Sequence, residues 1–510
     1  MPKLREIRLT NRWFKPPARG IFNFLMVFNV LGILVLITGL AILLSLPFSW
    51  YYGGEEFQAV MGTGLAIAGV GLVIWFFTKD VQNKELKKRD GYLIVTLGWL
   101  VMSAVGALPY VTSGAIPSYT DAFFETISGF TTTGASILGT EIESLPMGLH
   151  FWRAMTHWIG GMGIIVLTIA ILPLLGIGGM QLYAAEVPGP TPDKLTPRVK
   201  ETAKRLWIVY IALTAVEMIL LMIGDMGFFD ALCHSMATLS TGGFSTKQAS
   251  MGAFSAYHQY IVTLFMFIAG ANFALTFHAL KGKPQRLWEN EEFRVYLGTV
   301  IALIGIVTAV VFLGTYQEQG KDLEEAFRDS AFQVVSVMTT TGFGTADFTS
   351  WGPMMMTLFF MLMFTGACAG STSGGMKFVR LIVLSKNSYL ELKRQIHPKA
   401  ILPVRFNKKG ISQDIVSRIK AFFLVFVILF VMGTLVMSAM GLDYVSAFGS
   451  VAATLGNIGP GLGIVGPGDS QNFAQLPDAG KWFLSFLMLL GRLELFTVLI
   501  LFTPFFWLEK

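Results

Sequence analysis

The chain has 510 residues, of which 53% are hydrophobic and only 14% are charged, and its formal net charge at pH 7 is +6. Soluble proteins carry roughly 25% charged residues. This composition therefore excludes a disordered chain, a fibrous repeat and a cytosolic enzyme, and it predicts an all-α polytopic membrane protein. Cys233 and Cys368 are too few for a disulfide framework, and their apolar or small neighbours predict two small buried side chains.

The apolar stretches predict ten membrane spans, because a helix needs about 20 apolar residues to cross the hydrocarbon core of a bilayer. In chain order the spans are 21–48, 57–77, 92–108, 149–175, 206–226, 257–279, 296–313, 351–384, 421–440 and 482–506. We expect no cleavable signal, since the first apolar stretch is long and follows a basic arm.

The basic residues divide unevenly between the two sides of these spans. Of the 38 Lys and Arg residues, 32 lie in the N-terminal arm, in alternate connections and at the C-terminus, whereas five lie in the other loops. Cytoplasmic loops carry the excess of Lys and Arg in membrane proteins, so we expect both termini to be cytoplasmic. The positive charge does not indicate nucleic-acid binding, because no basic patch is interleaved with stacking aromatic residues.

Four outward loops carry one pattern, which predicts an internal duplication. An aspartate precedes a nine-residue, mainly apolar segment, a glycine follows thirteen positions after the aspartate, and a threonine stands two positions before that glycine. The aspartate–glycine pairs are Asp121/Gly134, Asp230/Gly243, Asp329/Gly342 and Asp443/Gly456, and the threonines are Thr132, Thr241, Thr340 and Thr454.

Each copy is predicted to be a helix, a short re-entrant helix and a second helix, because nine apolar residues cannot span a bilayer. The aspartate would cap the short helix, and the glycine would let the backbone turn and present carbonyl groups. Irregular backbone at membrane depth lines a polar cavity or is buried in protein. Four such turns could replace the hydration shell of a cation. The alternative is that the four segments are surface turns capped by aspartate. Solvated turns would not need the nine-residue apolar segments that precede each glycine.

Four such repeats in one chain resemble the Trk/Ktr/HKT superfamily of cation transporters. Two further N-terminal spans and the strings HWIGGMGIIVL (157–167), EVPGPTPDKLTPRVKETA (186–203) and GSTSGGMK (370–377) are similar to its TrkH-like bacterial branch. The resemblance covers nearly the whole chain. It implies potassium uptake across the bacterial inner membrane, a homodimer, and a cytosolic TrkA-like regulatory subunit that binds nucleotides. Potassium would be the substrate, with no cofactor in this chain.

The resemblance also implies a division of the chain. Residues 1–90 would form the basic arm and two extra membrane helices, and the four pore repeats would be 91–182, 183–283, 284–400 and 401–510. The third repeat would include an intramembrane loop.

The selectivity filter implied by the resemblance lies at the four threonine–glycine turns. Its potassium-binding residues would be Thr132, Thr133, Gly134, Thr241, Gly242, Gly243, Thr340, Thr341, Gly342, Thr454, Leu455, Gly456 and Asn457. The fourth copy departs most, because Leu455 and Asn457 replace small or hydroxyl residues. Gly134 favours potassium, since plant relatives that prefer sodium have serine there. A filter with one glycine per repeat predicts moderate discrimination against sodium.

A run of ten small residues breaks the eighth span, and the resemblance assigns it to an intramembrane loop that closes the pore beneath the filter. The predicted gate residues are Gly366, Gly370, Ser371, Thr372, Ser373, Gly374, Gly375 and Arg492. The alternative for the loop is a small-residue packing face between helices. Lys377 and Arg380 would couple the loop to the regulator.

Arg492 lies within the last span, where a charge is costly and suggests a function. The resemblance places it in the pore, where a fixed positive charge would oppose cations. The alternative is a structural ion pair with Glu494 or another carboxylate, although a residue two positions away does not share its helix face. Glu217, a lone carboxylate in the fifth span, is either a packing group or part of a coupling site for a second ion.

No constellation in the sequence predicts catalysis or a resident metal. His150 and His157 lack further Cys or His at zinc spacing, and His234 is expected to be a hydrogen-bonded polar group. The G-x-G-x-x-G at 461–466 has no preceding strand and no following helix, so we expect a flexible outer loop. No Ser/His/Asp arrangement, P-loop or HExxH motif is readable, and the sequence predicts a transporter rather than an enzyme.

Three functions are compatible with these features. The leading hypothesis is a potassium-conducting pore gated from the cytosol. A symporter of K⁺ with Na⁺ or H⁺ could use the same filter, and a non-conducting membrane scaffold or sensor for the cytosolic partner could retain the same fold.

Overall fold

A computed structural model describes residues 22–79, 87–163, 199–467 and 472–508. The described chain consists of helices and one small hairpin, in which β1 (Arg405–Phe406) pairs antiparallel with β2 (Lys409–Gly410). The all-α membrane architecture is therefore confirmed. The basic arm, most of the string at 186–203 and the end of the string at 157–167 lie outside the described residues.

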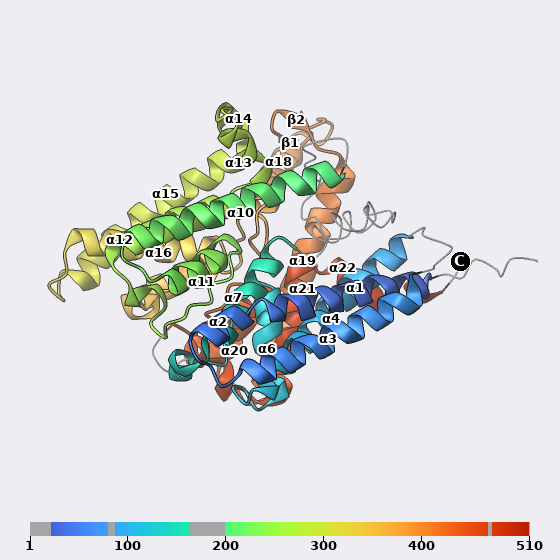
Figure 1. Ribbon diagram of the computed structural model, residues 1–510. Coiled ribbons are helices and arrows are strands. Elements are labelled where there is room, and N and C mark those ends of the chain that lie inside the picture. The colour runs from blue at the N-terminus through green and yellow to red at the C-terminus, as the bar shows by residue number, and fades with distance from the viewer. Residues whose placement is uncertain (1–21, 80–86, 164–198, 468–471, 509–510) are drawn as a thin grey trace, which may run out of the picture.

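The N-terminal helices are α1 (Phe24–Leu43), α2 (Leu46–Tyr51) and α3 (Phe57–Thr78). They lie beside α4 on one side of the molecule (Figure 1). Helices α1 and α3 approach each other closely, because a Cβ atom on Gly39 would lie 2.4 Å from the backbone nitrogen of Ala68, and one on Gly71 would lie 2.3 Å from that of Leu36. Only glycine allows such an approach.

The order of long helix, short helix and second helix occurs four times in the rest of the chain. The long helices are α4 (Lys88–Gly106), α10 (Val199–Ile223), α15 (Glu291–Val311) and α19 (Gln413–Ala439). The short helices are α6 (Tyr119–Phe130), α11 (Phe228–Leu239), α16 (Leu323–Met338) and α20 (Tyr444–Leu455). The second helices are α7 (Met147–Gly161), α12 (Ala256–Ala269), α17 (Pro353–Leu362) and α21 (Asp478–Arg492).

Other elements of the described residues, most of them short, connect these helices. The remaining α-helices are α5 (Leu108–Thr112), α13 (Phe273–Leu280), α14 (Gln285–Glu289), α18 (Phe378–Ile396), α22 (Phe496–Leu499) and α23 (Pro504–Trp507). Short 3₁₀ turns are η1 (Thr140–Ser144), η2 (Ser250–Ala253), η4 (Phe348–Trp351), η5 (Gly463–Val465), η6 (Phe473–Gln475) and η7 (Ile500–Phe502), and η3 (Phe312–Tyr316) is a π-helix.

Several predicted spans are not single helices. In the described residues six helical stretches are long and apolar enough to cross a membrane, with α1 and α2 forming one and α4 and α5 another, and two further candidates are sharply bent pairs. Helices α12 and α13 meet at 110°, and the pair formed by α21 and α22–η7 is bent by 112°. The predictions of continuous spans at 257–279 and 482–506 are therefore wrong. The span predicted at 351–384 is divided by a loop between α17 and α18, and that at 149–175 leaves the described residues after 163.

The breaks have local physical causes. The Asn272 side chain accepts hydrogen bonds from the backbone N–H groups of Ala274 and Leu275, and so begins a new helix at α13. After α21, Glu494 and Leu495 both have φ 55°, a left-handed conformation that cannot continue a right-handed helix. Neither cause appears in hydropathy.

The predicted aspartate caps are found in only one repeat. Asp443 accepts hydrogen bonds from two N–H groups of α20 at 3.1 Å. Asp121 and Asp230 lie inside the first turns of their helices, and Asp329 lies in the middle of α16. The capping prediction is therefore wrong for the first three repeats.

The two cysteines are free and buried, as the sequence predicted. Cys233 lies in α11 and has 2% of its surface exposed, and Cys368, in the loop before α18, has 1% exposed.

Candidate ion pathway

Four turns with one backbone conformation follow the short helices. In each turn a non-glycine residue with φ between 51° and 57° is followed two positions later by a glycine with φ between 78° and 101°. The non-glycine residues are Thr132, Thr241, Thr340 and Asn457, and the glycines, here called the ring glycines, are Gly134, Gly243, Gly342 and Gly459. A positive φ is strained for β-branched threonine, whereas asparagine adopts it more readily, so the surrounding structure must hold the three threonine turns in place.

The ring glycines connect the four turns into a closed circuit. A Cβ atom on Gly134 would lie 2.1 Å from the carbonyl oxygen of Gly242, in the next repeat. The corresponding separations are 2.0 Å from Gly243 to the Thr341 oxygen, 2.0 Å from Gly342 to the Ile458 oxygen and 2.7 Å from Gly459 to the Thr133 oxygen. Each ring glycine therefore makes room for a carbonyl group of the following repeat, and the fourth repeat closes on the first.

This circuit corrects the predicted alignment of the fourth repeat. Thr454 and Leu455 are the last residues of α20, and Gly456 caps that helix with φ −80°. The turn equivalent to 132–134 is therefore 457–459, three positions beyond the threonine–glycine match in the sequence. Of the four residues predicted for this copy, only Asn457 belongs to the turn. Counting from Asp443 fails because that residue precedes its helix, whereas Asp121 and Asp230 lie within theirs.

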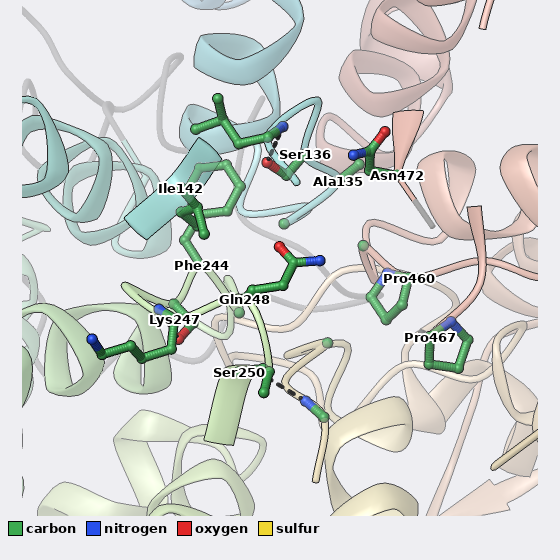
Figure 2. Close-up of a pocket in the computed structure, with 18 of the residues that line it drawn as sticks. Ala135, Ser136, Ile142, Phe244, Lys247, Gln248, Ser250, Pro460, Pro467 and Asn472 are labelled. Carbon is green, nitrogen blue, oxygen red and sulfur yellow. Dashed lines mark hydrogen bonds between the residues drawn. The ribbon is translucent and has the colours of Figure 1, made fainter. Parts of the chain in front are cut away.

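A cavity of about 390 Å³ opens beside the circuit and is lined by all four ring glycines. Figure 2 shows Ala135, Phe244 and Pro460, which directly follow three of them, together with Lys247 and Asn472 around the same space. A cavity with four carbonyl-bearing turns at one boundary is suited to an ion that exchanges water for protein oxygens.

The loop between α17 and α18, here called the intramembrane loop (363–377), contacts two of these turns directly. The backbone N–H of Gly374 donates to the Thr340 hydroxyl at 2.7 Å, and the hydroxyl groups of Thr340 and Ser373 lie 3.2 Å apart. A Cβ atom on Gly374 would lie 2.6 Å from Cβ of Asn457. The loop therefore packs against the third and fourth turns.

Side chains from the second repeat and from the start of the third hold the intramembrane loop in place. The Asn272 side chain donates to the carbonyl of Ala369 at 2.8 Å. The carboxylate of Glu292, in α15, accepts from the backbone N–H groups of Ala369 at 2.8 Å and Val379 at 2.9 Å. Glu292 was not identified from the sequence. Its position in the first turn of a long helix looked like a favourable charge at a helix start, which is common and carries no functional signal.

Arg492 bonds to backbone carbonyl groups rather than to Glu494. Its guanidinium donates to the Thr372 carbonyl of the intramembrane loop at 2.8 Å, and to the carbonyls of Gly160, and of Gly161 at 3.2 Å, at the end of α7. Glu494 forms an ion pair with Arg380. The alternative of a pair between Arg492 and Glu494 is therefore wrong, and Arg492 links the loop to the first repeat.

Comparison with known proteins identifies the family. A family model described as TrkH, cation transport protein, matches residues 56–508. This chain belongs to the TrkH family.

Relatives of this TrkH-family chain are similar over nearly their full length. The Trk system potassium uptake protein TrkH of Salmonella typhimurium is 42% identical, over 96% of this chain and 100% of the relative. The Trk system potassium uptake protein TrkG of Escherichia coli K12 is 34% identical, over 94% and 98%. The crystal structure of the potassium transporter TrkH from Vibrio parahaemolyticus matches with a TM-score of 0.85 and 38% identity, over 96% of this chain and 100% of that one.

Polar side chains inside the short helices of the TrkH-family fold tie down the backbone that follows each turn. The hydrogen-bonding residue lies nine positions before the ring glycine in three repeats. Glu125 accepts from the N–H of Ile137 at 2.9 Å, His234 bonds to the Ser245 hydroxyl at 2.9 Å, and Gln333 donates to the Ala346 carbonyl at 2.7 Å. These residues have no common chemical type, so the pattern was not visible in the sequence.

A buried ion pair lies within the first repeat, and its arginine also bonds to the second repeat. Arg153 Nε and Glu125 Oε1 are 2.6 Å apart, and the two side chains are 3% and 0% exposed. Arg153 also donates to the Ser245 carbonyl at 2.9 Å and to the Ser136 hydroxyl at 3.2 Å. Breaking a buried pair by removing one partner leaves an uncompensated charge, so this pair fixes the relative position of the two loops.

The other polar residues singled out in the sequence are buried within the protein. His150 Nε2 lies 2.7 Å from the Ile142 carbonyl, and His234 Nδ1 lies 2.7 Å from the Asp230 carbonyl. His234 is therefore a hydrogen-bonded polar group, as predicted. Glu217 is fully buried in α10, and neither of its carboxylate oxygens has a hydrogen-bond partner among the described residues.

The G-x-G-x-x-G segment packs closely against α20. A Cβ atom on Gly461 would lie 2.7 Å from the Gly449 carbonyl oxygen, and one on Gly463 would lie 2.3 Å from the Ser446 hydroxyl. The expectation of a flexible loop is therefore wrong, because these glycines serve close packing beside the fourth turn.

Proposed function

We propose that this chain takes up potassium across the bacterial inner membrane through the four turns. The closed circuit of ring glycines and neighbouring carbonyl groups carries the argument, because carbonyl oxygens can replace the hydration shell of a dehydrated cation. The potassium-binding residues are then 132–134, 241–243, 340–342 and 457–459. The names of the similar proteins, which are potassium uptake proteins, support the same substrate.

Growth of a potassium-uptake-deficient bacterial strain at low potassium tests this function. Expression of the chain should restore growth, and a non-conducting scaffold or sensor should not. Reversal potentials in proteoliposomes under opposing ion gradients separate a pore from a symporter. The potential of a pore follows the potassium gradient alone, whereas that of a coupled carrier shifts with Na⁺ or H⁺.

The proposed gate consists of the intramembrane loop and Arg492. The loop contacts Thr340 and Asn457 in the described conformation, and it would have to withdraw from these turns to open a path. Arg492 and Lys377 both donate to loop carbonyl groups, which supports a loop restrained by positive charge.

The charge distribution supports a proposed topology, and the family supports a proposed assembly. We propose that both termini are cytoplasmic, which the excess of Lys and Arg on their side supports. A homodimer with a cytosolic TrkA-like nucleotide-binding subunit is proposed as the assembled form. Proteolysis of inside-out and right-side-out vesicles would test the placement of the termini, and crosslinking in membranes would test the assembly.

Replacing Glu292 with alanine is expected to raise potassium flux in the absence of a regulator. The carboxylate accepts charge-assisted bonds from the N–H of Ala369, within the loop, and from that of Val379, just after it. If the variant stabilises the closed loop by about 1 kcal/mol less than Glu292 does, the open state is favoured and flux rises roughly fivefold. Flux per folded protein in proteoliposomes is the measurement.

Glu291→Ala provides the matched control. Glu291 lies in the same turn but accepts from the backbone N–H of Asn407 at 3.0 Å and pairs with Lys386, away from the intramembrane loop. Equal flux in the Glu292 variant and the unmodified protein would remove Glu292 from the gate. Equal increases in both variants would indicate a general loosening of α15.

A further inference from the structure

The residue before the ring glycine is a glycine in the second repeat and has a side chain in the other three. The circuit of carbonyl groups does not require this difference. Thr133, Thr341 and Ile458 are β-branched residues, whereas the second repeat has Gly242. The backbone at Gly242 is outside the left-handed region, so its conformation does not demand glycine. All four residues supply a carbonyl group to the circuit.

In the first and third repeats the side chain at this position supports its own turn. The Thr133 hydroxyl pairs with the Thr131 hydroxyl at 2.7 Å, and the Thr341 hydroxyl pairs with the Thr339 hydroxyl at 2.8 Å. These bonds join the carbonyl-bearing residue to the end of the preceding short helix. Gly242 cannot form such a bond.

In the second repeat the imidazole of His157, from α7, occupies the missing volume. A Cβ atom on Gly242 would lie 2.2 Å from Nδ1 of His157 and 2.5 Å from its Cγ. These separations are far shorter than a van der Waals contact, so the ring stands where a side chain of residue 242 would be. His157 is fully buried.

The same imidazole holds the residue on the other side of the ring glycine. The backbone N–H of Phe244 donates to His157 Nδ1 at 3.4 Å, and the two rings stack with centroids 3.9 Å apart. The guanidinium carbon of Arg153 lies 3.5 Å from the centroid of the Phe244 ring. His157 therefore contacts the turn at 242 and at 244, on both sides of Gly243.

We propose that His157 is a positioning residue for ion selectivity, which replaces in the second repeat the side chain that Thr133 and Thr341 supply in theirs. The inference rests on the proposed potassium conduction. The carbonyl of Gly242 faces Gly134, so a displaced Gly242 would also disturb the junction between the first and second repeats. Histidine from a neighbouring helix thus sets the geometry of one quarter of the filter.

The test combines single and double variants, with the K⁺/Na⁺ permeability ratio in proteoliposomes as the readout. His157→Ala should lower the ratio about threefold, the effect of one neutral hydrogen bond and its packing. Gly242→Thr alone should lower it further, because its side chain would collide with the imidazole. The double variant His157→Ala/Gly242→Thr should recover most of the ratio, since the ring is absent and the Ser240 hydroxyl stands at the position equivalent to Thr131 and Thr339.

His150→Ala is the matched control, because His150 is a second buried histidine of α7 and bonds to the Ile142 carbonyl. It should leave the ratio unchanged. A double variant no more selective than the single variants would overturn the proposal, as would an unchanged ratio in His157→Ala. If the unmodified chain carried no potassium current, the proposed function would fail instead, so the two failures are distinguishable.

Discussion

Replacing Gly134 with serine is expected to lower the K⁺/Na⁺ permeability ratio at least tenfold. A side chain on Gly134 would meet the carbonyl oxygen of Gly242 at 2.1 Å, and the backbone φ of 78° is strained for any residue with a Cβ atom. The carbonyl group would have to move, and a change of only about 1.4 kcal/mol in the relative binding of the two ions gives a tenfold change. Bi-ionic reversal potentials measure the ratio directly.

The fourth repeat offers a control for the position of the filter. Gly459→Ala should reduce selectivity, because a Cβ atom there would lie 2.7 Å from the Thr133 carbonyl oxygen. Gly456→Ala should retain selectivity even if it costs stability, because its Cβ atom would instead approach the carbonyls of Ala452 and Met363. If selectivity were lost only in the Gly456 variant, the fourth turn of the filter would lie at 454–456, as the sequence predicted. An unchanged ratio in a normally expressed Gly134→Ser protein would contradict the filter assignment.

Replacing Arg492 with alanine is expected to increase potassium flux about tenfold per folded protein. A unit positive charge 4 Å from a cation costs about 4 kcal/mol at an effective dielectric constant of 20, and water in the pore reduces that cost. A remaining barrier of about 1.4 kcal/mol corresponds to a tenfold change in rate. The variant also releases the Thr372 carbonyl of the intramembrane loop. Glu494 keeps its partner in this variant, since it pairs with Arg380.

Arg492→Lys separates charge from geometry. Lysine keeps the positive charge but cannot reproduce the planar guanidinium that donates to Thr372, Gly160 and Gly161. We expect its flux to stay within roughly twofold of the unmodified protein. Equal increases in the alanine and lysine variants would mean that anchoring of the loop, rather than charge, sets the barrier. Unchanged flux in the alanine variant would place Arg492 outside the ion pathway.

Local sequence properties were sufficient for the class of protein and for most of the architecture. The length of the apolar stretches and the low charged fraction predict membrane helices without any long-range information. The threonine–glycine turns of the first three repeats lie at the positions predicted from the sequence. The two-residue spacing from threonine to glycine is the same in each of these copies. The family resemblance rests on motifs that are contiguous in the sequence.

The tertiary structure decided which groups meet. The fourth turn lies at 457–459 because only there does the backbone reach both the first and third repeats, and the spacing from Asp443 carries no record of that contact. Arg492 could be recognised as an unusual charge in a span, but its partners are carbonyl groups from α7 and the intramembrane loop. Carbonyl groups are common to every residue, so a sequence does not single them out. His157 and Gly242 are 85 positions apart, and only the packing of α7 against the second turn shows that one fills the space left by the other.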